Sequence, residues 1–286
     1  MDALRAKGRG RHYSPVRGAV EQVLRVVYGD GWAAALWGRA PGATEVRVVR
    51  ERVVVPGLGR PLRLGFASDL HIGPTTPPRL LEAAFDLLAE ARPDVLALGG
   101  DYVFMEATAR TAETLRGLVA RVPAATKVAV MGNHDLWTHH GLLEDALREA
   151  GATVLINQGL KLPGPHGHVG VVGLDEPWTG APDAPAAFAA VADARVRLAL
   201  VHAPEGLPLL AGRGVALALC GHTHGGHIAL PGPRPVVVPG QISRQYPYGR
   251  HELDGLTLLV SRGLGGIELP IRAYAPPDVI ICDLVP

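Results

Sequence analysis

Short apolar runs alternate with amphipathic segments through most of the chain. Runs of about four to eight apolar residues are typical of buried strands, and apolar residues at three- and four-residue spacing are typical of helices. Strands are predicted over 46–55, 61–67, 95–98, 127–131, 153–156, 168–174, 196–201 and 215–219. Helical segments are predicted over 78–91, 107–121, 141–150 and 205–210. Strands that alternate with helices predict an α/β fold whose sheet is buried on both faces.

The first 44 residues depart from this alternation. Residues 1–12 are basic and lack apolar periodicity, which predicts a disordered arm. The apolar residues that follow share one face of a short amphipathic helix: Val16, Val20, Val23, Leu24 and Val27. This helix either packs on the main domain, or lies on a membrane surface with Trp32 and Trp37 as interfacial anchors. Residues 45–286 are expected to form the main domain.

Composition adds a few limits to this picture. The 286 residues are 48% hydrophobic and 19% charged, which is typical of a folded globular protein. The formal net charge of +1 indicates no nucleic-acid partner. Glu21, Arg25 and Asp30 interrupt the most apolar N-terminal stretch, so we expect neither a transmembrane helix nor a signal peptide. The expected location is the cytoplasm, with peripheral contact to the cytoplasmic membrane as the alternative.

Polar side chains follow five of the predicted strands. They are carboxylates, imidazoles and one amide, most of them beside glycines: Asp69, His71, Asp101, Asn133, His134, His202, His222 and His224. The loops beyond the carboxyl ends of strands are where α/β sheets build their sites. One such strand end would be unremarkable, but five of them predict a single shared site.

The chemistry of these side chains narrows the kind of site. Carboxylate, imidazole and amide oxygen together suit Mn, Fe, Zn, Co or Mg, and no thiolate is among them. Seven such ligands are more than one ion needs and are enough for two ions that share a carboxylate. Two neighbouring ions can polarise a phosphoryl oxygen and generate a hydroxide near neutral pH. The predicted chemistry is phosphoester hydrolysis.

These motifs resemble a known family in their order along the chain. Asp69-Leu70-His71, Gly100-Asp101, Gly132-Asn133-His134-Asp135, His202 and Gly221-His222-Thr223-His224 are similar to the five motifs of the calcineurin-like metallophosphoesterases. Residues 201–205, 225–226 and 263–265 resemble the bacterial, envelope-associated branch, which includes enzymes acting on phospholipid-like or UDP-diacylglucosamine substrates. The resemblance covers residue 62 to the C-terminus. It implies a four-layer α/β/β/α sandwich, with two β-sheets flanked by helices.

The resemblance also implies a role for each residue. One metal ion would take Asp69, His71 and His224, and the other would take Asn133, His202 and His222. Asp101 would bridge the two ions, with manganese favoured as the metal. A metal-bridging hydroxide would attack the phosphorus, while His134 would assist the leaving group as general acid or stabilise the developing phosphoryl charge.

Two positions depart from the family pattern. Phe104 stands where many members carry a second Asp that orients the catalytic histidine, so another acceptor, such as a backbone carbonyl, would have to hold His134, or it is held less tightly. His227 stands where the envelope branch commonly has Gln. His227, Tyr102 and Trp137 are the predicted substrate contacts.

The sequence therefore predicts a dinuclear metal-dependent hydrolase of a phosphomonoester, phosphodiester or pyrophosphate. One alternative is a membrane-peripheral hydrolase of phospholipid or UDP-diacylglucosamine-type substrates, with a lipid-linked phosphate in place of a small phosphoester. An alternative of another class is a non-catalytic phosphoesterase fold that serves as an interaction scaffold. A scaffold would have no chemical need for the seven ligands and His134, which favours the enzyme.

Overall fold

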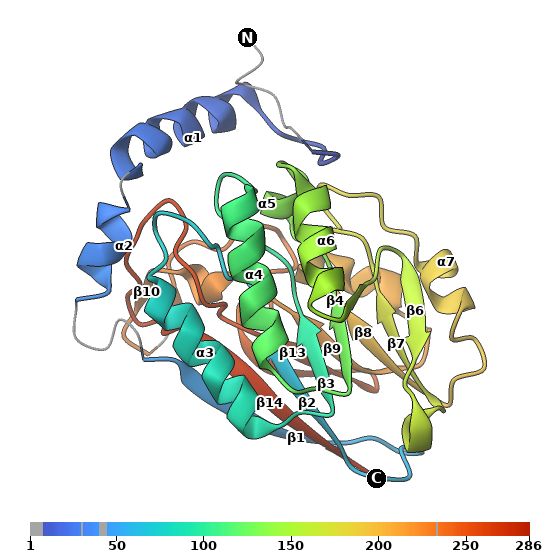
Figure 1. Ribbon diagram of the computed structural model, residues 1–286. Coiled ribbons are helices and arrows are strands. Elements are labelled where there is room, and N and C mark those ends of the chain that lie inside the picture. The colour runs from blue at the N-terminus through green and yellow to red at the C-terminus, as the bar shows by residue number, and fades with distance from the viewer. Residues whose placement is uncertain (1–7, 30, 40–44, 233) are drawn as a thin grey trace.

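The protein is built on two six-stranded sheets, which lie one behind the other in the computed structural model (Figure 1). The structure describes residues 8–29, 31–39, 45–232 and 234–286. The first sheet has the order β1 (Arg47–Val54), β14 (Asp278–Val285), β2 (Leu62–Ala67), β3 (Val95–Leu98), β4 (Thr126–Ala129) and β5 (Ala152–Val154). The second has the order β12 (Gly249–Leu253), β13 (Leu256–Val260), β9 (Val215–Cys220), β8 (Val196–Leu200), β7 (Val169–Gly173) and β6 (Gln158–Lys161). A small hairpin joins β10 (Ala229–Leu230) to β11 (Arg234–Pro235).

Side-chain alternation along the strands makes a core between the two sheets. Leu64 and Phe66 of β2 belong to the same buried cluster as Leu217 and Leu219 of β9. Residues of the opposite parity, such as Cys220, face the outer layer on the far side of their sheet. Because successive side chains of a strand point to opposite faces, both faces of both sheets are buried.

Helices cover the outer face of each sheet. The first sheet carries α3 (Pro78–Ala91), α4 (Ala109–Arg121) and α6 (His140–Glu149), whose apolar side chains share one cluster with that sheet. The second sheet carries α7 (Ala184–Ala189) and the 3₁₀ helix η3 (Pro204–Leu210). The remaining short helices lie in loops: α5 (Asn133–Leu136), η2 (Gly164–His166) and η4 (His224–Gly226). The predicted four-layer α/β/β/α sandwich is confirmed.

The predicted elements match the first sheet well and the end of the chain poorly. The helix over 78–91 and the strand over 95–98 have the predicted bounds, and the segment over 205–210 is helical as a 3₁₀ helix. β6 and the strands from β10 onward were not predicted. The regular alternation of strands and helices stops after β9, and β14 pairs with both β1 and β2, near the other end of the chain.

The N-terminal segment is ordered where the structure describes it. α1 (Pro15–Tyr28) begins at Ser14, whose hydroxyl accepts the Arg17 backbone N–H as an N-cap, and α2 (Trp32–Trp37) follows. Before α1, the Arg9 guanidinium makes two hydrogen bonds of 2.6 and 2.7 Å to the Asp175 carboxylate. The prediction of disorder is therefore wrong for residues 8–12, and the rest of the predicted arm lies outside the described residues.

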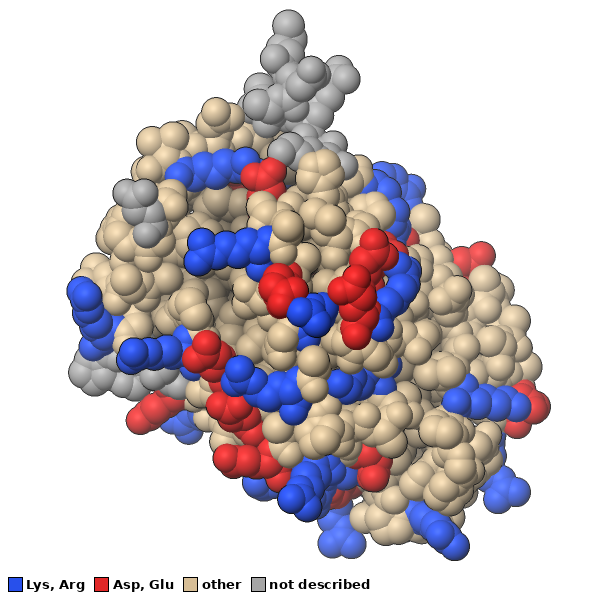
Figure 2. All heavy atoms as spheres, viewed as in Figure 1, with Lys and Arg blue, Asp and Glu red and all other residues tan. Residues whose placement is uncertain are grey.

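The apolar face of α1 is turned away from the domain. Val16, Val23 and Val26 are 73%, 60% and 81% exposed, whereas Glu21 and Tyr28 on the opposite face are buried. Figure 2 shows charged side chains along the side of α1 that faces the domain, and an uncharged outer edge. In α2, Trp37 is buried against Leu80 of α3 and cannot be an interfacial anchor as predicted, whereas Trp32 and Leu36 are 49% and 61% exposed. No helix among the described residues is long and apolar enough to cross a membrane.

Candidate metal centre

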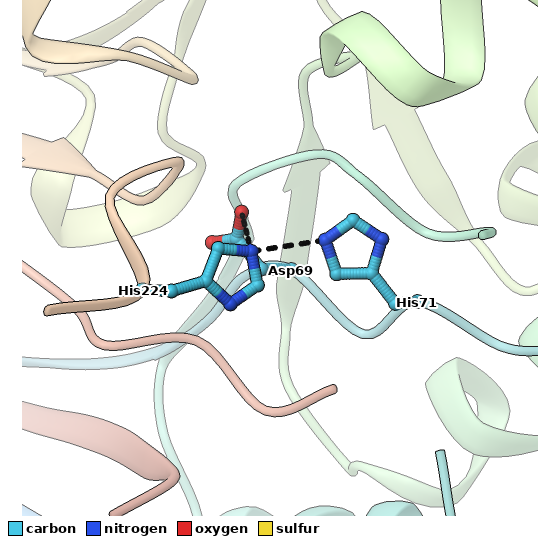
Figure 3. A group of neighbouring side chains, drawn as sticks. All are labelled: Asp69, His71 and His224. Atoms are coloured by element: carbon cyan, nitrogen blue, oxygen red, sulfur yellow. Dashed lines mark hydrogen bonds and ion pairs between the residues drawn. The ribbon is translucent and has the colours of Figure 1, made fainter. Parts of the chain in front are cut away.

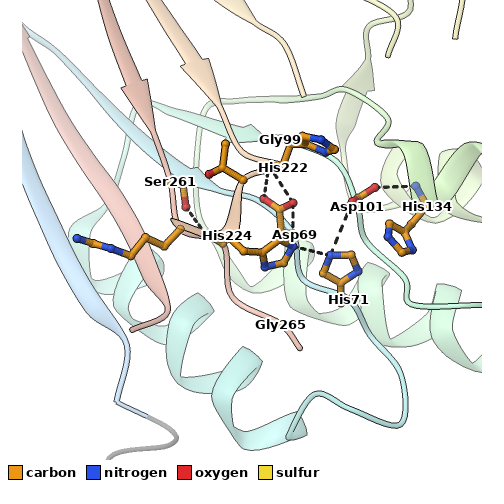
Figure 4. Close-up of polar contacts among 12 residues, drawn as sticks. Asp69, His71, Gly99, Asp101, His134, His222, His224, Ser261 and Gly265 are labelled. Carbon is orange, nitrogen blue, oxygen red and sulfur yellow. Dashed lines mark hydrogen bonds and ion pairs between the residues drawn. The ribbon is translucent and has the colours of Figure 1, made fainter. Parts of the chain in front are cut away.

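The predicted site residues come together where five strands end. β2, β3 and β4 are parallel neighbours in the first sheet, and β8 and β9 are parallel neighbours in the second. Their carboxyl ends therefore open on one edge of the sandwich, and the loops beyond them meet there (Figure 4). The loops carry all eight predicted residues, which fall into neighbouring groups joined by short contacts: Asp69, His71, Asp101, Asn133, His134, His202, His222 and His224.

A first cluster consists of Asp69, His71 and His224 (Figure 3). Each residue offers one ligand atom, and these atoms lie within 4.8 Å of one another. The Nε2 atoms of His71 and His224 are 3.0 Å apart, and Nε2 of His224 is 3.6 Å from a carboxylate oxygen of Asp69. All three side chains are buried. Two imidazoles and a carboxylate that converge in this way can hold one divalent cation.

A second cluster consists of Asp101, His202 and His222, whose ligand atoms also lie within 4.8 Å of one another. Nε2 of His202 is 3.3 Å from Nδ1 of His222 and 3.1 Å from the amide oxygen of Asn133. The donor set here is imidazole, carboxylate and, from Asn133, amide oxygen, which suits a second divalent cation.

Asp101 lies between the two clusters. Its Oδ2 atom is 3.4 Å from Nε2 of His202 in the second cluster and 3.7 Å from Nε2 of His71 in the first. Its Oδ1 atom accepts the backbone N–H of His134 at 2.8 Å, which fixes the orientation of the carboxylate. This is the placement that a carboxylate shared by two ions requires.

In the second cluster, a nitrogen lone pair and two oxygen atoms face one another, which is unfavourable unless a positive charge lies between them. Nδ1 of His202 donates to the Gly99 carbonyl at 2.8 Å, so Nε2 of a neutral ring carries the lone pair. That lone pair faces the Asn133 amide oxygen and the Asp101 carboxylate. Although burial alone would lower it, Asp101 raises the pKa of His202 to about 10. The cluster therefore attracts positive charge, and a divalent metal ion fits this demand.

Burial keeps the histidines of the first cluster in the form that binds metals. It lowers the pKa of His71 to about 4 and holds the pKa of His224 well below its usual value. A neutral imidazole is the ligating form. Burial also raises the pKa of Asp69 to about 6, and the two oxygens of this carboxylate accept the His222 backbone N–H at 3.0 Å each.

The backbone is strained at the candidate ligands themselves. Left-handed φ angles, which are uncommon for residues other than glycine, occur at five of them: Asp69 (54°), His71 (44°), Asp101 (54°), His222 (70°) and His224 (52°). Such conformations cost about 1–3 kcal/mol each and cluster at functional sites. Gly132 and Gly221 allow the close packing, since a Cβ atom on either would overlap the carboxylate of Asp101 or Asp69.

Asp135 is a site residue to which the sequence analysis assigned no role. Its carboxylate accepts the backbone N–H of Tyr102 at 2.8 Å and that of Gly132 at 2.9 Å. Asp135 thereby ties the loop after β3 to the loop after β4, which carry Asp101 and Asn133. Its place next to His134 in the same motif was the signal that could have identified it.

Arg272 also supports the site from the far end of the chain. Its guanidinium donates to the Gly265 carbonyl at 2.7 Å and to the Arg262 carbonyl at 2.8 Å, and Nη2 lies 2.9 Å from Nδ1 of His224. Burial lowers its pKa to about 10. No local sequence pattern marks Arg272, because the contact depends on how the C-terminal loop folds back.

The three predicted substrate contacts are buried in other interactions. Tyr102 is 0% exposed and its hydroxyl donates to the Val130 carbonyl at 2.7 Å, so it has no surface with which to touch a substrate. The Trp137 indole N–H donates to the Arg11 carbonyl at 2.8 Å, which binds it to the N-terminal segment instead. His227 is 5% exposed, with Nε2 2.8 Å from the Leu269 carbonyl oxygen.

Because position 104 is Phe and not Asp, another group has to contact the His134 ring. The Phe104 ring lies 5.7 Å from the His134 ring and 6.0 Å from the His71 ring, between centroids. The Arg17 guanidinium of α1 lies at the His134 ring. Its Nη2 atom is 3.2 Å from Nδ1 and 3.3 Å from Nε2 of that ring. A donor thus stands where an acceptor was predicted. Sequence analysis missed Arg17.

Two groups of candidate metal ligands, with Asp101 close to both, lie at the edge of an α/β/β/α sandwich, which is the arrangement of a metal-dependent hydrolase. Comparison with known proteins agrees: the profile of the calcineurin-like phosphoesterases matches residues 62–226, more than half of the chain. The chain belongs to the calcineurin-like phosphoesterase family and is a hydrolase.

Curated relatives cover most of this chain. It is 30% identical over 228 residues to phosphodiesterase YaeI of Escherichia coli, which spans 79% of this chain and 83% of the relative. It is 26% identical over 220 residues to the uncharacterized metallophosphoesterase YkuE of Bacillus subtilis, spanning 76% and 77%. It is 24% identical over 282 residues to UDP-2,3-diacylglucosamine pyrophosphatase LpxG of Chlamydia trachomatis, spanning 77% and 82%. These relatives belong to the predicted bacterial branch.

Proposed function

We propose that the protein hydrolyses a phosphomonoester, phosphodiester or pyrophosphate with two divalent metal ions, held by residues of a domain that spans 45–286 and follows an N-terminal segment of residues 1–44. The observation that carries this proposal is the position of Asp101, within 3.7 Å of ligand nitrogens in both clusters. Asp69, His71 and His224 would hold one ion, and Asn133, His202 and His222 the other. Manganese is the favoured metal.

When bound, two such ions supply Lewis acidity toward the phosphoryl oxygens and make a water-derived nucleophile available near neutral pH. Side chains of the protein position the reacting groups and assist the leaving group. Asp101 joins the two clusters and holds the His134 backbone in place through its 2.8 Å hydrogen bond. His134 faces the substrate and assists the leaving oxygen, either by giving it a proton or by stabilising the developing charge.

The purified protein should hydrolyse bis-p-nitrophenyl phosphate when Mn²⁺ is supplied, because the donor set matches that ion. Turnover should disappear after treatment with a chelator and return when Mn²⁺ is added back. Absorbance of released p-nitrophenol measures the rate, and elemental analysis of the protein measures the bound metal. Absence of turnover with Mn²⁺, Fe²⁺, Zn²⁺, Co²⁺ and Mg²⁺ would favour the interaction scaffold over the enzyme.

A second candidate places the reaction at a lipid surface, on a phospholipid or UDP-diacylglucosamine-type substrate. Large exposed apolar side chains gather in three segments: α1 with α2, the β10–β11 hairpin with Val236 and Val237 directly after it, and the loop at 269–274. All but three of the large exposed apolar residues in the described chain lie there. The segments are neighbours, since the Tyr28 hydroxyl donates to the Glu268 carbonyl and Ala229 donates to Ala273. Such a patch beside a site favours contact with membrane. The relative LpxG is named for a diacylglucosamine substrate.

The full chain should bind vesicles of phosphatidylethanolamine and phosphatidylglycerol in a pelleting assay. Anionic lipid is chosen because residues 1–12 are basic. Replacing Val16, Val23 and Val26 by Ser should weaken binding on the order of 1,000-fold, since burying one Val is worth roughly 1.5 kcal/mol and each 1.4 kcal/mol is about a factor of ten. Val54→Ser, at a residue that is 66% exposed on β1, is the matched control. Equal binding by the triple variant and the control would exclude α1 as the lipid contact.

A further inference from the structure

We propose that Arg17 of α1 binds the phosphate of the substrate, so that the N-terminal helix completes the active site. This inference rests on the proposed phosphoesterase function and names a residue outside the family motifs. It also assigns the two faces of α1 different tasks, because Arg17 lies on the face opposite the exposed valines.

Arg17 reaches the reacting end of the site. Its Nη2 atom lies 3.2 Å from Nδ1 and 3.3 Å from Nε2 of His134. His134 in turn belongs to a group with His71 and Asp101 whose ligand atoms lie within 4.8 Å of one another. A phosphate that contacts His134 therefore comes within hydrogen-bonding reach of the Arg17 guanidinium.

Neighbouring side chains hold the Arg17 guanidinium in place. Its Nε atom donates to Glu21, one helical turn further on, at 2.9 Å, and Glu21 is itself held by the Tyr13 hydroxyl at 2.8 Å. The guanidinium carbon lies 4.1 Å from the centre of the Trp137 ring, which supports its flat face. The Arg17 side chain is only 22% exposed. A guanidinium that is already oriented loses little freedom when an anion binds.

With metal ions bound, the net charge of the site would favour an anion beside His134 and Arg17. Two bound divalent cations would outweigh the two carboxylates among the candidate ligands, Asp69 and Asp101, and Phe104 adds no charge beside His134. Arg17 is a donor only, so it gains most from an acceptor with several oxygens, and its planar fork matches phosphate. Inorganic phosphate and the phosphoryl group of a substrate share this chemistry.

Arg17 has one distant ion pair with the domain, 3.9 Å from its Nη2 atom to a Glu268 carboxylate oxygen, and other residues make the shorter contacts that attach α1. Arg25, two turns further along the same polar face, pairs with Glu106 at 2.9 Å, and the Tyr28 hydroxyl donates to the Glu268 carbonyl at 3.2 Å. Before the helix, Arg9 pairs with Asp175 at 2.6 Å. These contacts attach α1 before its start and along its second half, while Arg17 projects from the first turn of the helix toward His134.

The test compares Arg17→Ala with Arg25→Ala in the full-length, Mn²⁺-loaded protein. Calorimetric titration with inorganic phosphate gives the dissociation constant, and hydrolysis of bis-p-nitrophenyl phosphate gives kcat and KM. Arg17→Ala should weaken phosphate binding on the order of 10- to 100-fold, the range for a lost hydrogen bond to a charged group. KM should rise in parallel, Arg17→Lys should lose less, and added guanidinium ion should restore part of the affinity of Arg17→Ala. Arg25→Ala should match the wild type.

Two results would overturn the proposal. One is a phosphate dissociation constant in Arg17→Ala equal to that of an active wild type, which would leave the phosphoesterase function standing. The other is an equal loss in Arg25→Ala, which would show that anchoring of α1, and not contact with phosphate, is what matters. A wild-type protein that neither binds phosphate nor hydrolyses the diester would remove both this proposal and the proposed function.

Discussion

Asp101→Asn should lower turnover by about 10³-fold or more while the protein stays folded. The substitution removes the negative charge that both clusters share, but its amide oxygen can still accept the His134 backbone N–H. At an effective dielectric constant of about 20, one pair of unit charges 4 Å apart is worth about 4 kcal/mol. Each 1.36 kcal/mol is a factor of ten in rate, so loss of this one attraction already accounts for about 10³-fold.

Three measurements separate loss of the site from loss of the fold. Circular dichroism should be unchanged, elemental analysis should find less metal per chain, and bis-p-nitrophenyl phosphate hydrolysis should fall to background. Asp193→Asn is the matched control, because this carboxylate is 75% exposed and pairs with Lys161 away from the site. Unchanged turnover in Asp101→Asn would refute the bridging role.

His134→Ala should keep its metal and lose rate by roughly 10²–10⁴-fold, the range for general acid–base catalysis. The ring of His134 lies beside the clusters, 4.8 Å from the ring of His71 between centroids, but it is not needed to complete either set of ligands. Elemental analysis beside the hydrolysis assay checks both halves of the prediction.

The comparison variant for His134 is His139→Ala, an exposed histidine five residues further along the chain. It should retain both the rate and the metal content of the wild type. If His134→Ala instead loses its metal, the side chain is a ligand and its assignment as the group that assists the leaving oxygen is wrong. His134→Ala should slow hydrolysis less when the leaving group of the substrate has a lower pKa, because such a leaving group needs less help from a proton donor.

Local patterns were sufficient to find the residues that the structure brings together as candidate ligands. Asp69, Asp101 and His202 each follow a short apolar run, and a residue just beyond a buried strand is fixed in space by that strand. The predicted strands at 95–98 and 215–219 are β3 and β9 within one residue. The same reasoning failed for Tyr102, because a position in a loop near the site does not reveal that its hydroxyl turns back to the Val130 carbonyl.

By itself the sequence determined the α/β class, the strand ends that carry the ligands and the resemblance to phosphoesterases. These follow from side-chain periodicity and from residues close together in the chain. Only the tertiary structure decided that the polar face of α1 lies over the site and that Arg17 meets His134, 117 positions away. A helix pattern states which face is apolar, but not which face a folded domain will cover. Here Arg25 on the polar face pairs with Glu106 of the domain, so that face is turned inward and the valines are left outside.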